Sequence, residues 1–331
     1  SIRRQRQMCI RDSLSWVAST QGTPYANLGD ALSAVVVAAL AGVPVRHAHF
    51  DSPGERLVGV GTIGHAQKNG ALHIWGTGFD ATRNAVQPDL GQFIAPPDTA
   101  FHVHATRGPR SAGLLRTAGL ASGPCAHGDP VWLLPRIWPM ADVPKTTDIG
   151  VIVHITELDA LHPDAPLRAA YKRYAIPQDL QGSIRIINTL TEPTLDALKA
   201  KVAEIASCRM ILSTSLHGLV IAETYGIPCA WFSTEGTGTG TRLDLADDGV
   251  KIDHRMRDFY LGAGATHLPS FALDRQHPTD WQAAAEFVAA NWAPLVSDAS
   301  DLIQSFPLPL APRDAKGQWR LTSRAETEFR F

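Results

Sequence analysis

The stretch Thr214-Ser-Leu-His-Gly-Leu-Val-Ile-Ala-Glu-Thr-Tyr-Gly-Ile-Pro228 decides the fold. It follows a short apolar run that predicts a strand over residues 209–212, and its own pattern predicts a helix over 216–225 that ends at Gly-Ile-Pro. Another apolar run predicts a strand over 228–232. This order places His217 in the first turn of a helix at the carboxyl edge of a parallel sheet, where open α/β sheets bind ligands.

The same alternation of strands and helices extends along most of the chain and predicts an α/β fold with two lobes. The expected strands cover residues 56–60, 72–75, 100–105, 149–154, 184–187, 209–212 and 228–232. The expected helices cover residues 30–40, 111–118, 165–173, 194–207, 216–225 and 281–292. Two prolines without periodicity mark residues 138–147 as a linker. We therefore divide the chain into an N-terminal lobe (14–140), a C-terminal lobe (148–300) and a wrapping tail (305–331).

Composition excludes several classes of protein. The chain has 331 residues, and its 30 Lys and Arg nearly balance its 32 Asp and Glu, so no basic field is present to gather nucleic acid. The four cysteines have no metal-binding or disulfide spacing, which favours a reduced, cytoplasmic location. The longest apolar run, residues 31–45, is too short to span a membrane and predicts a buried helix. Four arginines near the start could contact acidic lipid at the inner face of the plasma membrane, although a solvated chain end also explains them: Arg3, Arg4, Arg6 and Arg11.

Two glycine-rich segments permit different interpretations. Residues 59–64 match G-x-G-x-x-G, but the next expected strand begins too soon for the crossover helix of a dinucleotide site. Residues 234–242, Thr-Glu-Gly-Thr-Gly-Thr-Gly-Thr-Arg, follow an expected strand and offer amides and hydroxyls to an anion, although a flexible loop explains them equally well.

His217 also has two interpretations. A helix N-terminus favours anions, and the hydroxyls of Ser213 and Ser215 lie beside it, which predicts a ligand site. The alternative is a structural contact at the start of the helix. Asp30 has a similar ambiguity, since aspartate is common in the first turn of helices.

Six short blocks, in this order, resemble the polysaccharide pyruvyl transferase family. They are Asn27-Leu-Gly-Asp-Ala-Leu32, Ile74-Trp-Gly-Thr-Gly-Phe79, Thr106-Arg-Gly-Pro-Arg-Ser111, Gly128-Asp-Pro130, Ser215-Leu-His-Gly-Leu-Val-Ile-Ala222 and Arg257-Asp-Phe-Tyr260. The similarity covers residues 14–265, and the ordered set is more specific than any one block.

The resemblance implies two Rossmann-like lobes that face each other across a cleft, as in glycosyltransferases of the B type. It also implies transfer of pyruvate from phosphoenolpyruvate, as a substrate and without a cofactor, onto two hydroxyls of a sugar in a polysaccharide or its lipid-linked precursor. The product is a cyclic ketal, and phosphate is released. The family's functional residues fall on Arg107, His217 and Asp30.

One position departs from the family pattern, because many members have an arginine where this chain has Ser215. Four residues are candidates to supply the missing charge: Arg242, Lys251, Arg255 and Arg257. The predicted donor site comprises Arg107, Ser213, Ser215, Gly218, Thr239, Arg242 and Arg257. The predicted acceptor site comprises Trp75, Gly76 and Asp80. We expect no catalytic metal, because arginines can neutralise a phosphate.

Two other functions remain open from the sequence. A nucleotide-sugar glycosyltransferase of the same fold is one, although no glutamate is followed eight residues later by a second glutamate, the spacing that many such enzymes use. A noncatalytic subunit of a polysaccharide assembly complex is the other. Release of phosphate or of nucleotide distinguishes these functions.

Overall fold

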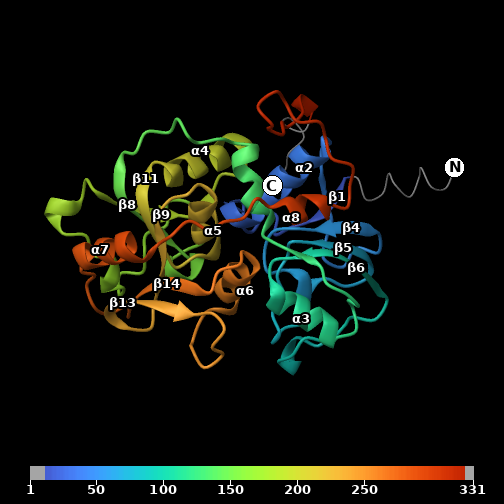
Figure 1. The fold of residues 1–331 in the computed structure, drawn as a ribbon, viewed down its shortest axis with the longest axis horizontal. Helices are drawn as coiled ribbons and strands as arrows, with labels where there is room; N and C mark the ends of the chain where they lie inside the picture. The colour runs from blue at the N-terminus through green and yellow to red at the C-terminus, as the bar shows by residue number, and fades with distance from the viewer. Residues whose placement is uncertain (1–11, 325–331) are drawn as a thin grey trace.

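The structure, a computed structural model, describes residues 12–324 and confirms the α/β fold with two lobes (Figure 1). The expectation of membrane contact by Arg3, Arg4, Arg6 and Arg11 falls outside the described residues. No helix within residues 12–324 is both long enough and apolar enough to cross a membrane.

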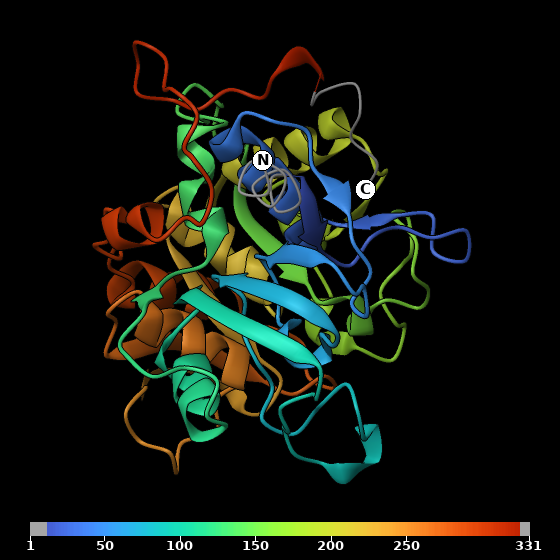
Figure 2. The ribbon, with the colours of Figure 1, turned by 90° about the vertical axis from the view of Figure 1, so that its right-hand side faces the viewer.

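The N-terminal lobe is built on a parallel sheet with strand order β3-β1-β4-β5-β6-β7. Its strands are β1 (Ser13–Ser15), β3 (Arg46–His47), β4 (Glu55–Val58), β5 (Gly70–Trp75), β6 (Thr99–Thr106) and β7 (Ala126–His127). Its helices are α2 (Leu28–Ala41) and α3 (Pro109–Thr117), with 3₁₀ turns η1 (Gly64–Ala66), η2 (Pro88–Leu90) and η3 (Pro130–Arg136). Because the strands are parallel, their carboxyl ends share one edge (Figure 2).

The C-terminal lobe has a second sheet with strand order β13-β14-β12-β11-β8-β9. Five strands are parallel: β8 (Thr147–Val153), β9 (Ile184–Asn188), β11 (Cys208–Ser213), β12 (Cys229–Ser233) and β14 (His267–Leu273). The edge strand β13 (Thr237–Asp244) is antiparallel to β14. The helices are α4 (Leu195–Ala206), α5 (Leu216–Thr224), α6 (His254–Gly262) and α7 (Trp281–Asn291), with 3₁₀ turns η4 (Ile155–Glu157), η5 (Lys172–Tyr174) and η6 (Gln178–Leu180). A last helix, α8 (Ser300–Gln304), packs on the N-terminal lobe.

Helix α2 joins the two lobes. Its residues are apolar on nearly every side, and nearly all of them are buried, as expected for a helix enclosed by protein. It packs against η3 and α4. Just before it, β2 (Ala26–Asn27) pairs with β10 (Leu190–Thr191) of the C-terminal lobe. The expected buried helix is therefore confirmed, and its first turn lies where the lobes meet.

The chain returns to the N-terminal lobe after α7, as Figure 1 shows for the path from α7 to α8. The indole of Trp75 donates to the Leu302 carbonyl at 2.9 Å and packs edge-on against Phe306. Farther along, Trp319 is buried, and its amide donates to the Arg136 carbonyl. The return segment therefore holds the N-terminal core, and Trp75 lies inside that core.

Two local predictions are wrong. The expected helix over 165–173 is absent, because Pro163 and Pro166 lack amide donors and the chain instead forms a bridge between Leu158 and Leu167. The glycine- and threonine-rich residues 234–242 form most of β13 rather than a loop. By contrast, the prediction that no crossover helix follows residues 59–64 is confirmed, because only the 3₁₀ turn η1 lies between β4 and β5.

We expect Trp75→Phe to destabilise the protein by about 1–3 kcal/mol, because it leaves the Leu302 carbonyl buried without a donor. Urea denaturation measures this change. The Michaelis constant for the acceptor should stay the same, since the indole is fully buried. Unchanged stability together with a raised acceptor Michaelis constant would instead indicate that Trp75 contacts the acceptor.

Candidate functional site

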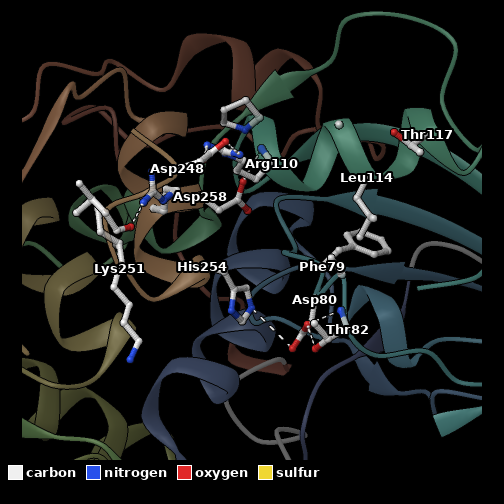
Figure 3. Close-up of a pocket in the computed structure, with 16 residues that line it drawn as sticks. Phe79, Asp80, Thr82, Arg110, Leu114, Thr117, Asp248, Lys251, His254 and Asp258 are labelled. Atoms are coloured by element: carbon white, nitrogen blue, oxygen red, sulfur yellow. Dashed lines mark hydrogen bonds and ion pairs between the residues drawn. The ribbon is translucent and has the colours of Figure 1, made fainter. Parts of the chain in front are cut away.

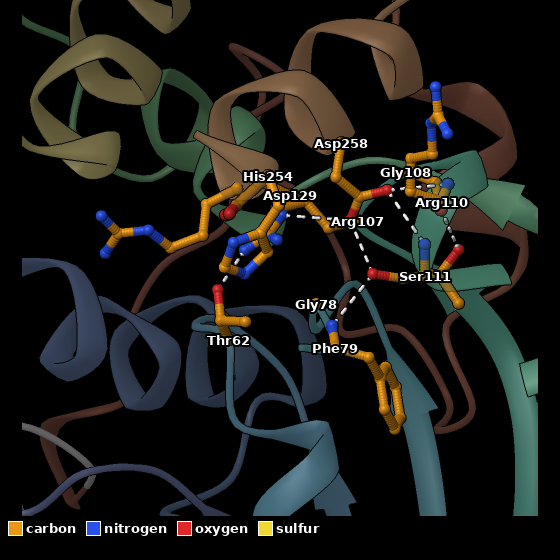
Figure 4. Close-up of polar contacts among 12 residues, drawn as sticks. Thr62, Gly78, Phe79, Arg107, Gly108, Arg110, Ser111, Asp129, His254 and Asp258 are labelled. Carbon is orange, nitrogen blue, oxygen red and sulfur yellow. Dashed lines mark hydrogen bonds and ion pairs between the residues drawn. The ribbon is translucent and has the colours of Figure 1, made fainter. Parts of the chain in front are cut away.

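Residues of four separate blocks meet between the two lobes, among them Gly78, Arg107, Asp129 and Asp258 (Figure 4). Strands β5 and β6 of the N-terminal sheet end at the loops that carry Gly78 and Arg107, and β11 of the C-terminal sheet leads into α5 and His217. Parallel strands bring such chain ends to one edge of each sheet. The first turn of α2, which carries Asp30, completes this region.

His217 lies in the first turn of α5 and faces Asp129. The turn before it is held by Ser213, whose hydroxyl accepts from the Ser215 amide at 3.0 Å and donates to the Ile152 carbonyl at 3.1 Å. The distance from His217 Nε2 to Asp129 Oδ2 is 3.6 Å, and neither atom has another hydrogen-bond partner. A buried carboxylate beside an imidazole fixes its orientation.

Two glycines let α2 and its neighbours pack against the ionisable groups. A Cβ on Gly29 would lie 2.0 Å from His217 Nδ1, so the imidazole occupies the space that glycine leaves. A Cβ on Gly61, where φ is +106°, would lie 3.0 Å from the Asp30 carboxylate. Burial raises the pKa of Asp30, His217 lowers it and Asp129 raises it again, with a net increase. Asp30 thus belongs to one electrostatic group with His217.

Arg107 has buried N–H groups without hydrogen-bond acceptors. Its side chain is fully buried, and a Cβ on Gly78 would lie 2.3 Å from Arg107 Cζ. Arg107 Nη1 donates to Thr62 Oγ1 at 2.5 Å, whereas Nε and Nη2 have no hydrogen-bond partner. Buried donors without acceptors are costly, which indicates a guanidinium ready to bind an anion.

Asp258 on α6 joins the C-terminal lobe to the start of α3 in the N-terminal lobe. Its Oδ1 accepts from the amides of Arg110 at 3.0 Å and Ser111 at 3.1 Å, and its Oδ2 accepts from Ser111 Oγ at 2.6 Å. Oδ2 also lies 3.4 Å from Arg107 Nε. No role was predicted for Asp258 beyond its place in a family block, because its pairing across the lobes leaves no local signal in the sequence.

A pocket of about 770 Å³ opens beside this network, with walls from both lobes (Figure 3). Asp80 from the N-terminal lobe and His254 from α6 face each other across it, with 3.9 Å between Oδ2 and Nε2. Burial acts to raise the pKa of Asp80, but hydrogen bonds from Thr82 and the nearby histidines outweigh it and lower the pKa. Asp80 therefore offers an ionised carboxylate to the pocket.

The structure separates the four candidates for the missing charge. Arg242 lines a different pocket with Glu223, and Lys251 is exposed and pairs with Glu235 at 2.6 Å. Arg257 donates to three backbone carbonyls, those of Leu245, Asp247 and Val250.

Arg255 alone among the four is electrostatically coupled to Asp30. Burial lowers its pKa, but hydrogen bonds to Asp253 and the charges of Asp253, Asp80 and Asp30 raise it overall. Arg255 Nη1 also lies 3.4 Å from His154 Nε2. Its guanidinium is therefore near both the His217 group and the pocket between the lobes.

Several predicted site residues lie outside this group. Trp75 is in the core, and Gly76 is packed against Pro130, where a Cβ would lie 2.4 Å from Cδ. Gly218 is enclosed by Ser213 and Ile152. Thr239 lines a third pocket, on the C-terminal sheet. The structure brings together His217, Asp30, Ser213 and Ser215, with Gly218 packed against Ser213. Asp80 and Arg257 line the pocket between the lobes, and Arg107 pairs with Asp258 beside it. Trp75, Gly76, Thr239 and Arg242 lie apart from these residues.

We expect Asp258→Asn to lower the free energy of unfolding by about 3 kcal/mol, because it leaves Arg107 as a buried charge without its counter-ion. The control is Asp248→Asn, which removes the exposed partner of Arg110 and should leave the free energy of unfolding nearly unchanged. Urea denaturation of the three proteins measures both changes. Equal effects would mean that Asp258 does not hold the two lobes together.

Comparison with known proteins identifies the family. The family model described as polysaccharide pyruvyl transferase matches residues 62–236, which is more than half of the chain and includes Arg107, Asp129 and His217. A search of curated proteins found no match. The chain therefore belongs to the polysaccharide pyruvyl transferase family and is a transferase that moves a pyruvyl group to polysaccharide.

Proposed function

We propose that the protein transfers pyruvate from phosphoenolpyruvate to two hydroxyls of one sugar, forming a cyclic ketal and releasing phosphate. The acceptor is a polysaccharide or its lipid-linked precursor, and with a lipid-linked acceptor the reaction takes place at the cytoplasmic face of the plasma membrane. The observation that carries this proposal is a fully buried arginine, Arg107, whose Nη2 has no hydrogen-bond partner. A histidine, His217, that lies 3.6 Å from a buried carboxylate supports it.

Arg107 and Arg255 are the proposed donor clamps. Phosphoenolpyruvate carries a phosphate and a carboxylate on one carbon. Guanidinium groups bind the oxygens of both groups through charge-assisted hydrogen bonds. Arg107 has free donors, and Arg255 supplies the charge that Ser215 lacks. The hydroxyl of Ser213 already serves the turn before α5 through the backbone of Ser215, so it shapes the site more than it binds the donor.

His217 is the proposed acid. It protonates the methylene carbon of phosphoenolpyruvate, and a sugar hydroxyl then attacks the adjacent carbon. The second hydroxyl displaces phosphate at the same carbon and closes the ketal. Asp129 stabilises the imidazolium before the proton leaves, and Asp30 takes the proton of an attacking hydroxyl. The reaction breaks two O–H bonds, the C=C π bond and the C–O bond to phosphate, and it forms one C–H and two C–O bonds. Of the two protons that the sugar loses, one replaces the proton given to carbon and the other leaves with phosphate.

The pocket between the lobes is the proposed acceptor site. Asp80, Thr82 and His254 offer an ionised carboxylate, a hydroxyl and an imidazole, which are suitable partners for sugar hydroxyls. The electrostatic interaction of Asp80 with Arg255 supports an acceptor site next to the proposed donor site.

The proposal is tested by incubating the protein with phosphoenolpyruvate and oligosaccharides from the source organism's own polysaccharide, stripped of pyruvate by mild acid. We expect release of phosphate together with a mass increase of one pyruvate ketal. The matched reaction uses a nucleotide sugar as donor. Release of nucleotide without release of phosphate would establish the glycosyltransferase function instead, and release of neither would favour a noncatalytic subunit.

We expect His217→Gln to reduce kcat by roughly 10²–10⁴, because glutamine keeps a hydrogen bond but cannot transfer a proton near neutral pH. The melting temperature and the Michaelis constant for phosphoenolpyruvate should change little. Arg107→Lys is the complementary variant and should weaken donor binding by about 2–3 kcal/mol with smaller effect on kcat. A Gln variant that turns over at the native rate would rule out proton transfer by His217.

We expect the acidic limb of the pH profile of kcat/KM to lie above the usual range for aspartate. The proposed base Asp30 must be ionised, and burial raises its pKa, so activity is lost as the pH falls through that raised value. Steady-state kinetics across pH measures the limb, and Asp30→Asn should abolish it together with most activity. An Asn variant with the same limb would assign it to another group.

A further inference from the structure

A row of hydroxyl groups covers one face of the C-terminal sheet at its β13 edge. The strand register places Thr241 beside Ser270 and Ser270 beside Trp231, and it places Thr239 beside Ala272 and Ala272 beside Ser233. Directly paired residues project from the same face of a sheet. Three strands therefore present two short rows, and four of their six members carry a hydroxyl.

The repeated Gly-Thr sequence explains this arrangement. In a strand, alternate residues point to opposite faces, so threonines at 239 and 241 share the open face and Gly240 lies on the other. On that other face, a Cβ on Gly240 would lie 2.0 Å from the ring of Phe287 on α7. Glycine thus permits α7 to cover one face, while the threonines keep the opposite face polar.

The hydroxyl-bearing face forms a pocket of about 740 Å³. Ser270 is 1% exposed, and its hydroxyl has no hydrogen-bond partner although it lines the pocket. A buried hydroxyl without a partner is unfavourable unless a ligand satisfies it. The partly exposed indole of Trp231 adds an apolar surface beside the hydroxyls.

This pocket shares a wall with the pocket between the lobes. Both are lined by the same segment at the start of α6, through Lys251, Ile252 and His254. The cations here are not free for a phosphate, because Lys251 pairs with Glu235 at 2.6 Å. The chemistry therefore favours a neutral ligand rich in hydroxyls rather than an anion.

We propose that this face, defined by Trp231, Ser233, Thr239, Thr241 and Ser270, binds a sugar unit of the acceptor chain next to the unit that receives pyruvate. The inference rests on the proposed function, and it adds that the enzyme recognises an oligosaccharide rather than a single sugar. Hydroxyls donate and accept hydrogen bonds as sugars do, and an indole offers a flat apolar surface to a sugar ring.

The test is calorimetric binding of fragments with one to six sugar units, prepared from the source organism's polysaccharide after removal of pyruvate. The main variant is Thr239→Val with Thr241→Val, which keeps the shape and strand preference of both residues. Ser270→Ala is a second variant that removes only the unpartnered hydroxyl and should not lower stability. Thr266→Val, a threonine that lines a different pocket, is the matched control.

We expect the double variant to weaken binding of the six-unit fragment about tenfold, which corresponds to the loss of two hydrogen bonds, and Ser270→Ala to weaken it severalfold. Binding of the single sugar and of phosphoenolpyruvate should remain unchanged, and the control should match the native protein. Equal affinity of native and variant proteins for the six-unit fragment would overturn the proposal. So would tight binding of a nucleotide sugar that is lost in the double variant.

The measurement is independent of turnover, so the two proposals can fail separately. If the variants lose fragment binding but no phosphate is released from phosphoenolpyruvate, the sugar subsite stands and the proposed reaction is wrong. If phosphate is released and fragment binding is unchanged in the variants, the reaction stands and the subsite is wrong.

Discussion

The carboxylate of Asp258 is the contact on which the rest of the site depends. It lies on α6 of one lobe and accepts hydrogen bonds from the first backbone amides of α3 in the other lobe. The helix dipole favours a negative charge at this end of α3. The same carboxylate lies near the Arg107 guanidinium, so two buried opposite charges stabilise each other between the lobes. This contact sets the separation of the two sheet edges and thereby places Arg107 in the region that His217 faces.

Glycines make this close approach possible. Gly29 leaves room for the His217 imidazole, and Gly78 leaves room for the Arg107 guanidinium. A Cβ on Gly108 would lie 1.8 Å from the Asp258 carbonyl oxygen, so α6 touches the backbone of the α3 start. The blocks that carry Asp30 and Arg107 thus each combine a charged residue with a glycine that accommodates a residue of another block. The glycine and the charged residue are neighbours in the sequence, but the glycine is required by a contact with a block that is distant in the sequence.

The sequence predicted the parts of the fold that depend on local order. The strand, turn and helix around His217 were predicted correctly because an apolar run, a polar turn and Gly-Ile-Pro mark their limits. Arg107, Asp30 and Asp80 were placed in the right region because each follows a strand or begins a helix at a sheet edge. Their roles stay predictions.

The partners of those residues could not be predicted from the sequence. Asp129 meets His217 and Asp258 meets Arg107 only after both sheets have formed, and no local pattern records such pairings. The Gly-Thr repeat was interpreted as a loop because of its glycines. Its period of two is typical of a strand and was the signal that could have identified β13.

The most direct test of the central claim is a crystal structure of the protein with phosphoenolpyruvate and no acceptor. If the meeting of the two lobes forms the donor site, the phosphate or carboxylate will accept hydrogen bonds from the free N–H groups of Arg107, with the methylene carbon facing His217. Binding of phosphoenolpyruvate on the threonine-bearing face of the C-terminal sheet, with Arg107 still unpartnered, would contradict the account.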